Sequence, residues 1–135
     1  MSIVAIRSAL ESRLSTITPP LSTAWENVLF TPVTGTPYQQ VSLMIADNKD
    51  MVVSDSSYVV VGFLQVILTY PMGSLSKACG TRADLICNHF RRGLQLTNSG
   101  FTVEINKSPR VSPAYIDGAF YKMPITISFK CFISL

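Results

Sequence analysis

Charged side chains are scarce in this sequence. Only 14% of its residues are Asp, Glu, Lys or Arg, and 47% are hydrophobic, whereas ordinary soluble domains carry about 25% charged residues. A chain of 135 residues makes a small domain with much surface for its volume. The shortage of charge therefore predicts that part of this surface is covered, either by a membrane or by other protein subunits.

A continuous apolar run long enough to cross a bilayer is also missing. The most apolar stretch, residues 58–70, is interrupted by Gln65 and is shorter than the roughly 20 residues of a spanning helix. The first residues have an amphipathic pattern in place of the basic region and apolar block of a signal peptide. We therefore expect other subunits, and not a membrane, to cover the apolar surface.

Cysteine and histidine are too few for a disulfide framework or an ordinary metal site. Cys79, Cys87 and Cys131 are an odd number without CxxC spacing, which favours reduced thiols in a cytosolic assembly. The single histidine, His89, cannot complete a conventional zinc site. It lies at the margin of a helical apolar stripe, where half-buried packing is a better interpretation than general-base catalysis. The sequence predicts no metal and no cofactor.

Catalytic motifs are absent as well. The chain has no GxSxG elbow, no Walker glycine loop and no GxGxxG. Asp47 and Asp50 suggest a cation site, but their segment lacks the Gly and terminal Glu of a calcium loop, so a solvated hairpin tip is the better interpretation. Cys79 falls near the centre of an apolar helix face, which favours an inert packing role. We expect this protein not to be an enzyme.

The sequence predicts two amphipathic helices. The first covers residues 3–17, can be capped by Ser2 and is ended by the Pro19-Pro20 pair. Its apolar stripe consists of Ile3, Ile6, Leu10, Leu14 and Ile17. The second follows residues 71–74, is capped by Ser74 or Ser76 and stops at Gly93. Its apolar face consists of Leu75, Cys79, Ala83, Ile86 and Phe90.

The remaining patterns are typical of strands. They cover residues 24–30, 38–45, 58–70, 101–107 and 123–133. Residues 47–57 are polar and are predicted to form an exposed loop or the tip of a long hairpin. Pro124 cannot donate to a ladder, so we expect the last strand to begin at an edge or bulge. The order lacks strict βαβ alternation, which predicts a single α+β domain over residues 1–135, with two helices packed on one face of a mainly antiparallel sheet and a projecting hairpin or loop.

Basic residues concentrate in the second half of the chain. Residues 71–135 carry eight basic and three acidic side chains, against three and five in residues 1–70. Arg91, Arg92, Lys107 and Arg110 would form a patch if the end of the second helix lies beside the later strands. No RNP-like or helix-turn-helix pattern accompanies them. Ordinary surface charge is therefore the default interpretation.

Several short features occur in a fixed order along the chain, and none is a catalytic signature. They are Ala24-Trp-Glu-Asn27, Phe30 with Gly35-Thr-Pro-Tyr-Gln39, Phe63-Leu-Gln-Val66 leading into Tyr70-Pro71, Phe90-Arg-Arg-Gly93, Asp117-Gly118 and Tyr121-Lys-Met-Pro124. In this order and spacing, the sequence resembles the tail terminator (tail completion) proteins of long-tailed phages over nearly its whole length. Residues 47–57 match no family pattern, and we expect variable length there.

This resemblance implies a structural virion protein of the phage tail or neck, assembled in the host cytoplasm. It implies a homo-hexameric ring seated on the last ring of tail tube protein, where it stops tube polymerisation and presents its other face to head-completion (connector) proteins. DNA would only pass through the channel, without sequence-specific binding. A head-to-tail interface closes such a ring by rotation, and an edge strand that pairs with the next subunit's sheet is one way to make it.

Two alternatives stay open: a head–tail joining or neck protein of similar fold, and a non-viral small binding module or enzyme. Within the leading hypothesis, polar hairpin tips commonly carry function, and basic residues near a channel would tune the potential that passing DNA experiences. The candidate interface residues are Asp47, Asn48, Lys49, Asp50, Met51, Asp55, Arg91, Arg92, Lys107 and Arg110.

Overall fold

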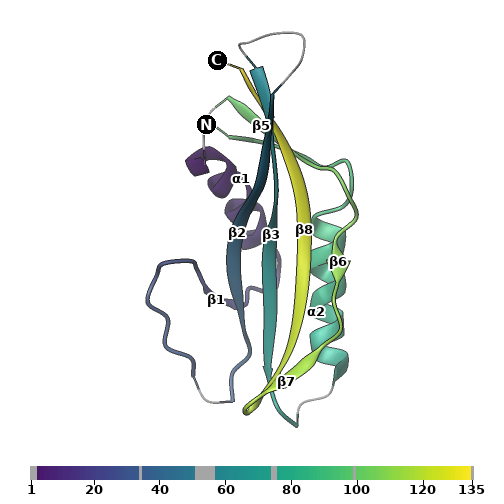
Figure 1. Ribbon diagram of the computed structural model, residues 1–135. Helices are drawn as coiled ribbons and strands as arrows, with labels where there is room; N and C mark the ends of the chain where they lie inside the picture. The colour runs from purple at the N-terminus through teal and green to yellow at the C-terminus, as the bar shows by residue number, and fades with distance from the viewer. Residues whose placement is uncertain (1–2, 34, 51–56, 74–75, 99, 135) are drawn as a thin grey trace.

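The computed structural model describes residues 3–33, 35–50, 57–73, 76–98 and 100–134 (Figure 1). They form an α+β fold in which every strand belongs to one sheet, as the sequence predicts. The helices are α1 (Ile3–Ser15) and α2 (Ser76–His89). The strands are β1 (Ser22–Ala24), β2 (Tyr38–Asp50), β3 (Ser57–Pro71), β4 (Gln95–Asn98), β5 (Phe101–Ile105), β6 (Arg110–Val111), β7 (Tyr115–Asp117) and β8 (Phe120–Ser134).

Three long strands, β2, β3 and β8, form the centre of the sheet (Figure 1). The strand order is β1-β2-β3-β8-β5-β4, and β6 and β7 also pair with β8. All pairs are antiparallel except the parallel pair β1–β2. The β-branched and aromatic residues of β3 suit this central position, because β3 has a neighbour along both sides.

The alternation of each long strand places one set of side chains in the core. Both helices add their apolar stripes to the same core cluster, including Leu10 of α1 and Ile86 of α2. The fully buried large residues of the long strands are Val60, Leu64, Leu68, Ile125, Ile127 and Phe129. The predicted helix faces are thus confirmed, except that Ile3 is 43% exposed at the start of α1 and Leu75 lies outside the described residues. The proposed cap residues Ser2 and Ser74 also lie outside them.

A bulge in β2 bends the β2–β3 pair. The register shifts between Ile45 and Asp47, opposite Gly62 of β3. A Cβ atom at position 62 would lie 2.2 Å from the carbonyl oxygen of Met44, so the backbones approach too closely there for any side chain. Glycine at this position therefore permits the local pairing.

The predicted strand at residues 24–30 is wrong. β1 ends at Ala24, and the following residues make a turn in which the Val28 amide donates to the Trp25 carbonyl oxygen at 3.2 Å. Asn27 adopts a φ of 60°, a left-handed conformation that asparagine tolerates and an extended strand excludes. The apolar residues of this segment therefore belong to a non-strand connection, which we call the arm (residues 25–33).

The predicted loop at residues 47–57 is shorter than expected. β2 continues to Asp50, and the register Asp47↔Val61 to Asp50↔Tyr58 pairs it with β3. Backbone hydrogen bonds form the ladder whatever the polarity of the side chains, so a polar sequence did not prevent the strand. The hairpin interpretation is confirmed, and its residues 51–56 lie outside the described residues.

The expected edge or bulge at Pro124 is only partly right. β8 is an inner strand, and Pro124 pairs with Ile67 of β3. On its other side, the carbonyl oxygen of Pro124 accepts from the Ser112 amide at 2.9 Å. The short strands β6 and β7 leave a break in their coverage of β8 between the Val111↔Ile125 and Tyr115↔Lys122 pairs. The missing amide of proline falls at this break, where the ladder does not need a donor.

Candidate assembly surface

The outer side of the long strand β2 is paired over only a short stretch. β1 pairs only with Tyr38–Gln40, and no other described strand pairs with β2 on that side. An open strand edge presents unpaired amide and carbonyl groups, which form a template for another chain. The stretch from Val41 to Asp50 is therefore a candidate docking edge.

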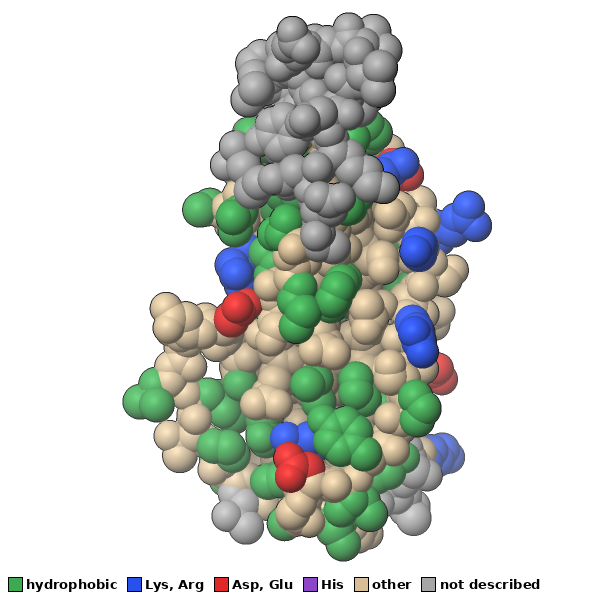
Figure 2. Space-filling view, in the orientation of Figure 1, with side chains coloured by type: hydrophobic (Ala, Val, Ile, Leu, Met, Phe, Trp, Pro, Cys, Tyr) green, Lys and Arg blue, Asp and Glu red, His purple; other side chains and the backbone are tan. Residues whose placement is uncertain are grey.

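The surface seen in Figure 2 has few charged side chains over the long strands. Hydrophobic and uncharged side chains dominate it, and several Lys and Arg side chains follow its right margin. Half-buried polar residues such as Ser42, Gln65 and Thr126 occupy the side of the sheet opposite the core. The low charge content of the sequence is therefore visible on this broad face of the molecule.

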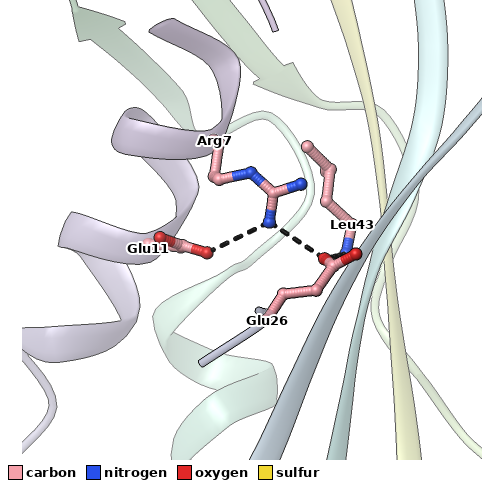
Figure 3. A network of polar contacts seen from close by, with 4 residues as sticks. All are labelled: Arg7, Glu11, Glu26 and Leu43. Atoms are coloured by element: carbon pink, nitrogen blue, oxygen red, sulfur yellow. Dashed lines mark hydrogen bonds and ion pairs between the residues drawn. The ribbon is translucent and has the colours of Figure 1, made fainter. Parts of the chain in front are cut away.

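One amide of the β2 edge is occupied by a side chain, as Figure 3 shows. Oε1 of Glu26 accepts from the Leu43 backbone amide at 2.8 Å and from Arg7 Nη1 at 2.9 Å. Arg7 also lies 3.5 Å from Glu11, one turn further along α1. Glu26 thus connects α1 to the edge of β2 and imitates the acceptor that a neighbouring strand would supply.

This network favours the charged form of Glu26. The hydrogen bond from the Leu43 amide, followed by the one from Arg7, lowers the pKa of Glu26 below its usual value. The same contact with Glu26 raises the pKa of Arg7. Because 41% of the Glu26 side chain is exposed, solvent weakens these interactions. The carboxylate that occupies the Leu43 amide is therefore only partly shielded from solvent.

The arm beside this edge presents apolar side chains to solvent. Leu29 is 95% exposed, and Val28 and Val33 are 60% and 65% exposed. The ring of Phe30 packs against that of Tyr38, with centroids 5.0 Å apart, which anchors the arm to the start of β2. A groove of about 380 Å³ separates the arm from the outer face of β2. Figure 1 shows the connection between β1 and β2 projecting from the body of the molecule.

The structure places the predicted site residues in two separate regions. Asp47–Asp50 lie on β2, close to its open edge, whereas Met51 and Asp55 lie outside the described residues. Arg91, Arg92, Lys107 and Arg110 are exposed on the far side of β8. The Gly93 amide donates to the Ile105 carbonyl oxygen at 2.7 Å, so the end of α2 does lie beside the later strands.

Sequence reasoning missed the residues that shape the β2 edge. Glu26 belongs to a motif that the sequence displays, but its contact with Leu43 depends on a turn that periodicity does not reveal. Leu29 was assigned to a strand, which concealed its exposure. The strong exposure of Leu29 is a property of the fold. The Pro- and Gly-containing sequence around it gives no clear signal of this exposure.

His89 and the cysteines behave as packing residues. Nε2 of the half-buried His89 lies 2.6 Å from Thr16 Oγ1 and 3.0 Å from the Arg13 carbonyl oxygen, joining the ends of the two helices. Burial, with a smaller contribution from the Arg13 charge, lowers the pKa of His89. Burial raises the pKa of Cys79 to about 11 and also raises the pKa values of Cys87 and Cys131. These thiols are free in the described structure and disfavour the reactive thiolate form.

Among the described residues, no cluster of three or more His, Cys, Asp and Glu side chains is placed to hold a metal ion. None of their helices combines the length and apolar character needed to cross a membrane.

Comparison with known proteins identifies the chain. A family model for the phage tail terminator protein matches residues 5–129. One solved structure, which carries no functional name, aligns with a TM-score of 0.77 and 26% identity and covers 97% of this chain and 96% of that chain. No curated protein matches. The fold and these matches define a structural protein of the phage tail. The chain belongs to the phage tail terminator protein family and is therefore a component of the virion.

Proposed function

We propose that six copies of this protein form a ring that caps the tail tube, stops its polymerisation and provides the joint to the head-completion proteins. Membership of the tail terminator family supports this role. The single structural observation behind it is the open β2 edge, with the exposed Leu29 beside it. Both features need a partner to be covered.

The two ends of the sheet suggest how neighbouring subunits meet. β2 is open beyond Gln40 at one end, and β4 is the last strand at the other, where it pairs only with β5 among the described strands. In a head-to-tail ring each copy contributes two different surfaces. The β2 edge of one copy pairs with the β4 side of the next, and the arm covers the joint. Backbone pairing supplies affinity, and the apolar arm supplies specificity.

The charged candidates have separate roles in this ring. The hairpin that contains residues 47–57 reaches toward a neighbouring ring or partner protein. Arg91, Arg92, Lys107 and Arg110 lie at an interface or near the channel and tune the potential around DNA, without contacts to particular bases. Deleting residues 51–56 should leave the fold intact and impair tail completion; normal infectious tails from the deletion would refute this role of the hairpin.

Assembly is tested with the purified protein and with isolated tail tubes. Light scattering after size-exclusion chromatography should give six subunits, either alone or once tubes are added as the template. Leu29→Asp should abolish ring formation and tube binding while the circular dichroism spectrum stays unchanged. The matched control is Leu85→Asp, on the partly exposed face of α2, which should assemble normally.

Two outcomes would contradict the proposal. A strictly monomeric protein that also fails to bind tubes would end it. Labelled protein that binds tailless heads in preference to tubes would favour the head–tail joining alternative. The identity of neighbouring genes supplies an independent check, because tube, tape-measure and connector genes are expected beside a tail terminator.

A further inference from the structure

A second exposed apolar surface lies across the sheet from the arm. Val111 of β6 and Tyr115 and Ile116 of β7 are 43%, 45% and 65% exposed. We call these three residues the β6–β7 patch. Among the described strands, β6 and β7 pair only with β8, so their outer sides are open. Figure 1 shows the arm beyond β2 and β6 beyond β8. The molecule therefore exposes two different apolar surfaces, one on each side of its central strands.

The arm and the β6–β7 patch lie at the same height along the strands. Hydrogen bonds run perpendicular to the strands of an antiparallel pair, so backbone pairing defines rows of residues across the sheet. One row consists of Tyr38, Thr69, Lys122 and Tyr115. The arm is anchored in this row, because the ring of Phe30 packs against that of Tyr38. Tyr115 of the patch ends the same row on the other side.

A charged residue accompanies each apolar surface, and the two charges are opposite. Glu26 is the only charged residue in positions 14–46, and it accepts from the Leu43 amide. A neighbouring row consists of Ser42, Gln65, Thr126 and Arg110. Arg110 is exposed, and none of the ion pairs among the described residues involves it. The other charge on β6 and β7, Asp117, is paired with Lys122 at 3.2 Å.

We propose that the β6–β7 patch of one copy packs against the arm of the next copy, where Arg110 pairs with Glu26. This inference rests on the proposed ring. In a head-to-tail ring all copies have the same orientation, and a rotation moves no atom along its axis. Surfaces at one height along the strands therefore meet when the ring axis follows the strands. Charge and apolar surface follow in the same order on both sides, so the two contacts form together.

This contact leaves the pairing of β2 with β4 intact, because β4 lies at a different height. Its row consists of Asp47, Val61, Lys130, Glu104 and Gln95. The interface thus has two parts, with backbone pairing beyond Ile45 and apolar packing at the rows of Tyr38 to Ser42. The groove of about 380 Å³ between the arm and β2 gives the patch a concave surface to enter. Tyrosine and arginine are enriched in such interfaces.

Cross-linking through introduced cysteines tests the contact. The double variant Leu29→Cys, Ile116→Cys is made in a Cys87→Ser background, because Cys79 and Cys131 are buried. Protein assembled alone or on tail tubes is treated with a short bismaleimide and separated by denaturing electrophoresis. We expect a ladder that reaches six subunits, because each copy links its arm to the patch of the next. A mixture of the two single variants should stop at two subunits, since each linked copy then lacks a second cysteine.

The positional control pairs Leu29→Cys with Val4→Cys in the same background. Val4 is 78% exposed on α1 and belongs to neither proposed surface. This variant should assemble and give no ladder. A ladder of equal length from it would show that cross-linking reports exposure alone, and the contact would be rejected.

The ion pair provides a second measurement that needs no cysteine. Arg110→Ala should raise the protein concentration at half-maximal assembly about twofold to fivefold, the size typical of an exposed pair. Added to Glu26→Ala, the same substitution should have no further effect, because its partner is already absent. Lys77→Ala is the control, because it removes an exposed base on α2 outside both surfaces; it should leave the concentration unchanged.

The outcomes separate this contact from the proposed function. Rings of six subunits from a double cysteine variant that gives no ladder would overturn the contact and leave the ring standing. Products that stop at two subunits would also overturn it, since they indicate a reciprocal dimer. Fully additive effects of Arg110→Ala and Glu26→Ala would exclude their pairing, even if the cysteine variant did not assemble. Failure of the original protein to form rings or to bind tubes would instead contradict the proposed function.

Discussion

The strands β2 and β8 both flank β3, yet their outer sides differ. β8 is paired in succession with β7, β6 and β5, so the chain itself covers much of this edge. Among the described residues, the outer side of β2 is covered only by β1 at Tyr38–Gln40 and by Glu26 at Leu43. The same fold thus closes one side of its central sheet and leaves the other available.

This difference separates residues that stabilise the fold from residues that await a partner. Along β8, Ile125, Ile127 and Phe129 are fully buried, and the exposed apolar side chains on that side, Val111, Tyr115 and Ile116, belong to the short covering strands β6 and β7. On the β2 side, Leu29 is nearly fully exposed and Met44 is 43% exposed. Substitutions in the core of β8 and beside β2 should therefore change different quantities, namely the free energy of unfolding in β8 and assembly beside β2.

The largest effect on stability is expected from Phe129→Ala on the closed side. Removal of a fully buried phenylalanine side chain costs about 3–5 kcal/mol through lost burial and the cavity left behind. Urea unfolding followed by circular dichroism measures the change. A loss below about 0.5 kcal/mol, the range of ordinary surface substitutions, would show that the β8 side does not carry the core.

A smaller loss is expected from Gly62→Ala, at the junction of the two sides. The added Cβ would lie 2.2 Å from the Met44 carbonyl oxygen, so the bulge of β2 must shift. Overpacking of this kind costs about 1–3 kcal/mol. The control is Gly80→Ala in α2, where an added Cβ meets nothing within 4 Å and a mid-helix alanine should stabilise the protein. Equal effects of the two substitutions on the midpoint of urea unfolding would contradict the close approach at Gly62.

A modest effect with a distinct pH dependence is expected from Glu26→Ala at the open edge. The folded-state pKa of Glu26 is depressed, so its stabilisation is present above its unfolded value of about 4.5 and disappears as the pH falls through the lower folded value. Unfolding of the variant and of the original protein should therefore differ at pH 7 and converge at acidic pH. Glu11→Ala is the matched control, because it loses only the longer contact with Arg7 and keeps the contact between Glu26 and Leu43. A difference at pH 7 that persists unchanged into acid would contradict the assignment.

The smallest effect is expected at His89, between the helix ends. Burial depresses its pKa, so folding favours the neutral ring: the stabilisation is present above the unfolded value of about 6.5 and is lost as the pH falls through the folded value. Between pH 7.5 and pH 5.5 the original protein should lose more stability than His89→Gln. Parallel unfolding curves for the two proteins across this range would exclude a contribution from His89.

The sequence predicted the helices and the long strands because their patterns repeat over many residues. The stripes of Leu10 and Ile86 and the alternation of β8 express burial directly, and burial determines the fold. The arm was mispredicted because its apolar residues match strand propensity, while a positive φ at Asn27 decides its conformation. The β2 edge could not be predicted either, since strand order depends on contacts between distant segments.

Arg82 shows the same limit within a correctly predicted helix. It lies three residues after Cys79 and four before Ile86, so helical spacing places it on the buried face. A charged residue at that position argues for exposure, whereas the fold buries it beside Pro19. Helical spacing indicated that residue 82 would be buried, but the composition of the sequence gave no reason to expect a cavity beside it.

The most direct measurement is hydrogen exchange of the β2 edge, in the free protein and after assembly on tail tubes. By strand alternation, the Ile45 amide faces the same side as that of Leu43, where no described strand pairs with β2. We predict rapid exchange of the Ile45 amide, resolved by nuclear magnetic resonance within residues 41–45 of the free protein, and slowing of roughly 100-fold or more after assembly, because pairing closes the edge. Unchanged exchange of this segment in a fully assembled ring would contradict the claim that β2 is the docking edge.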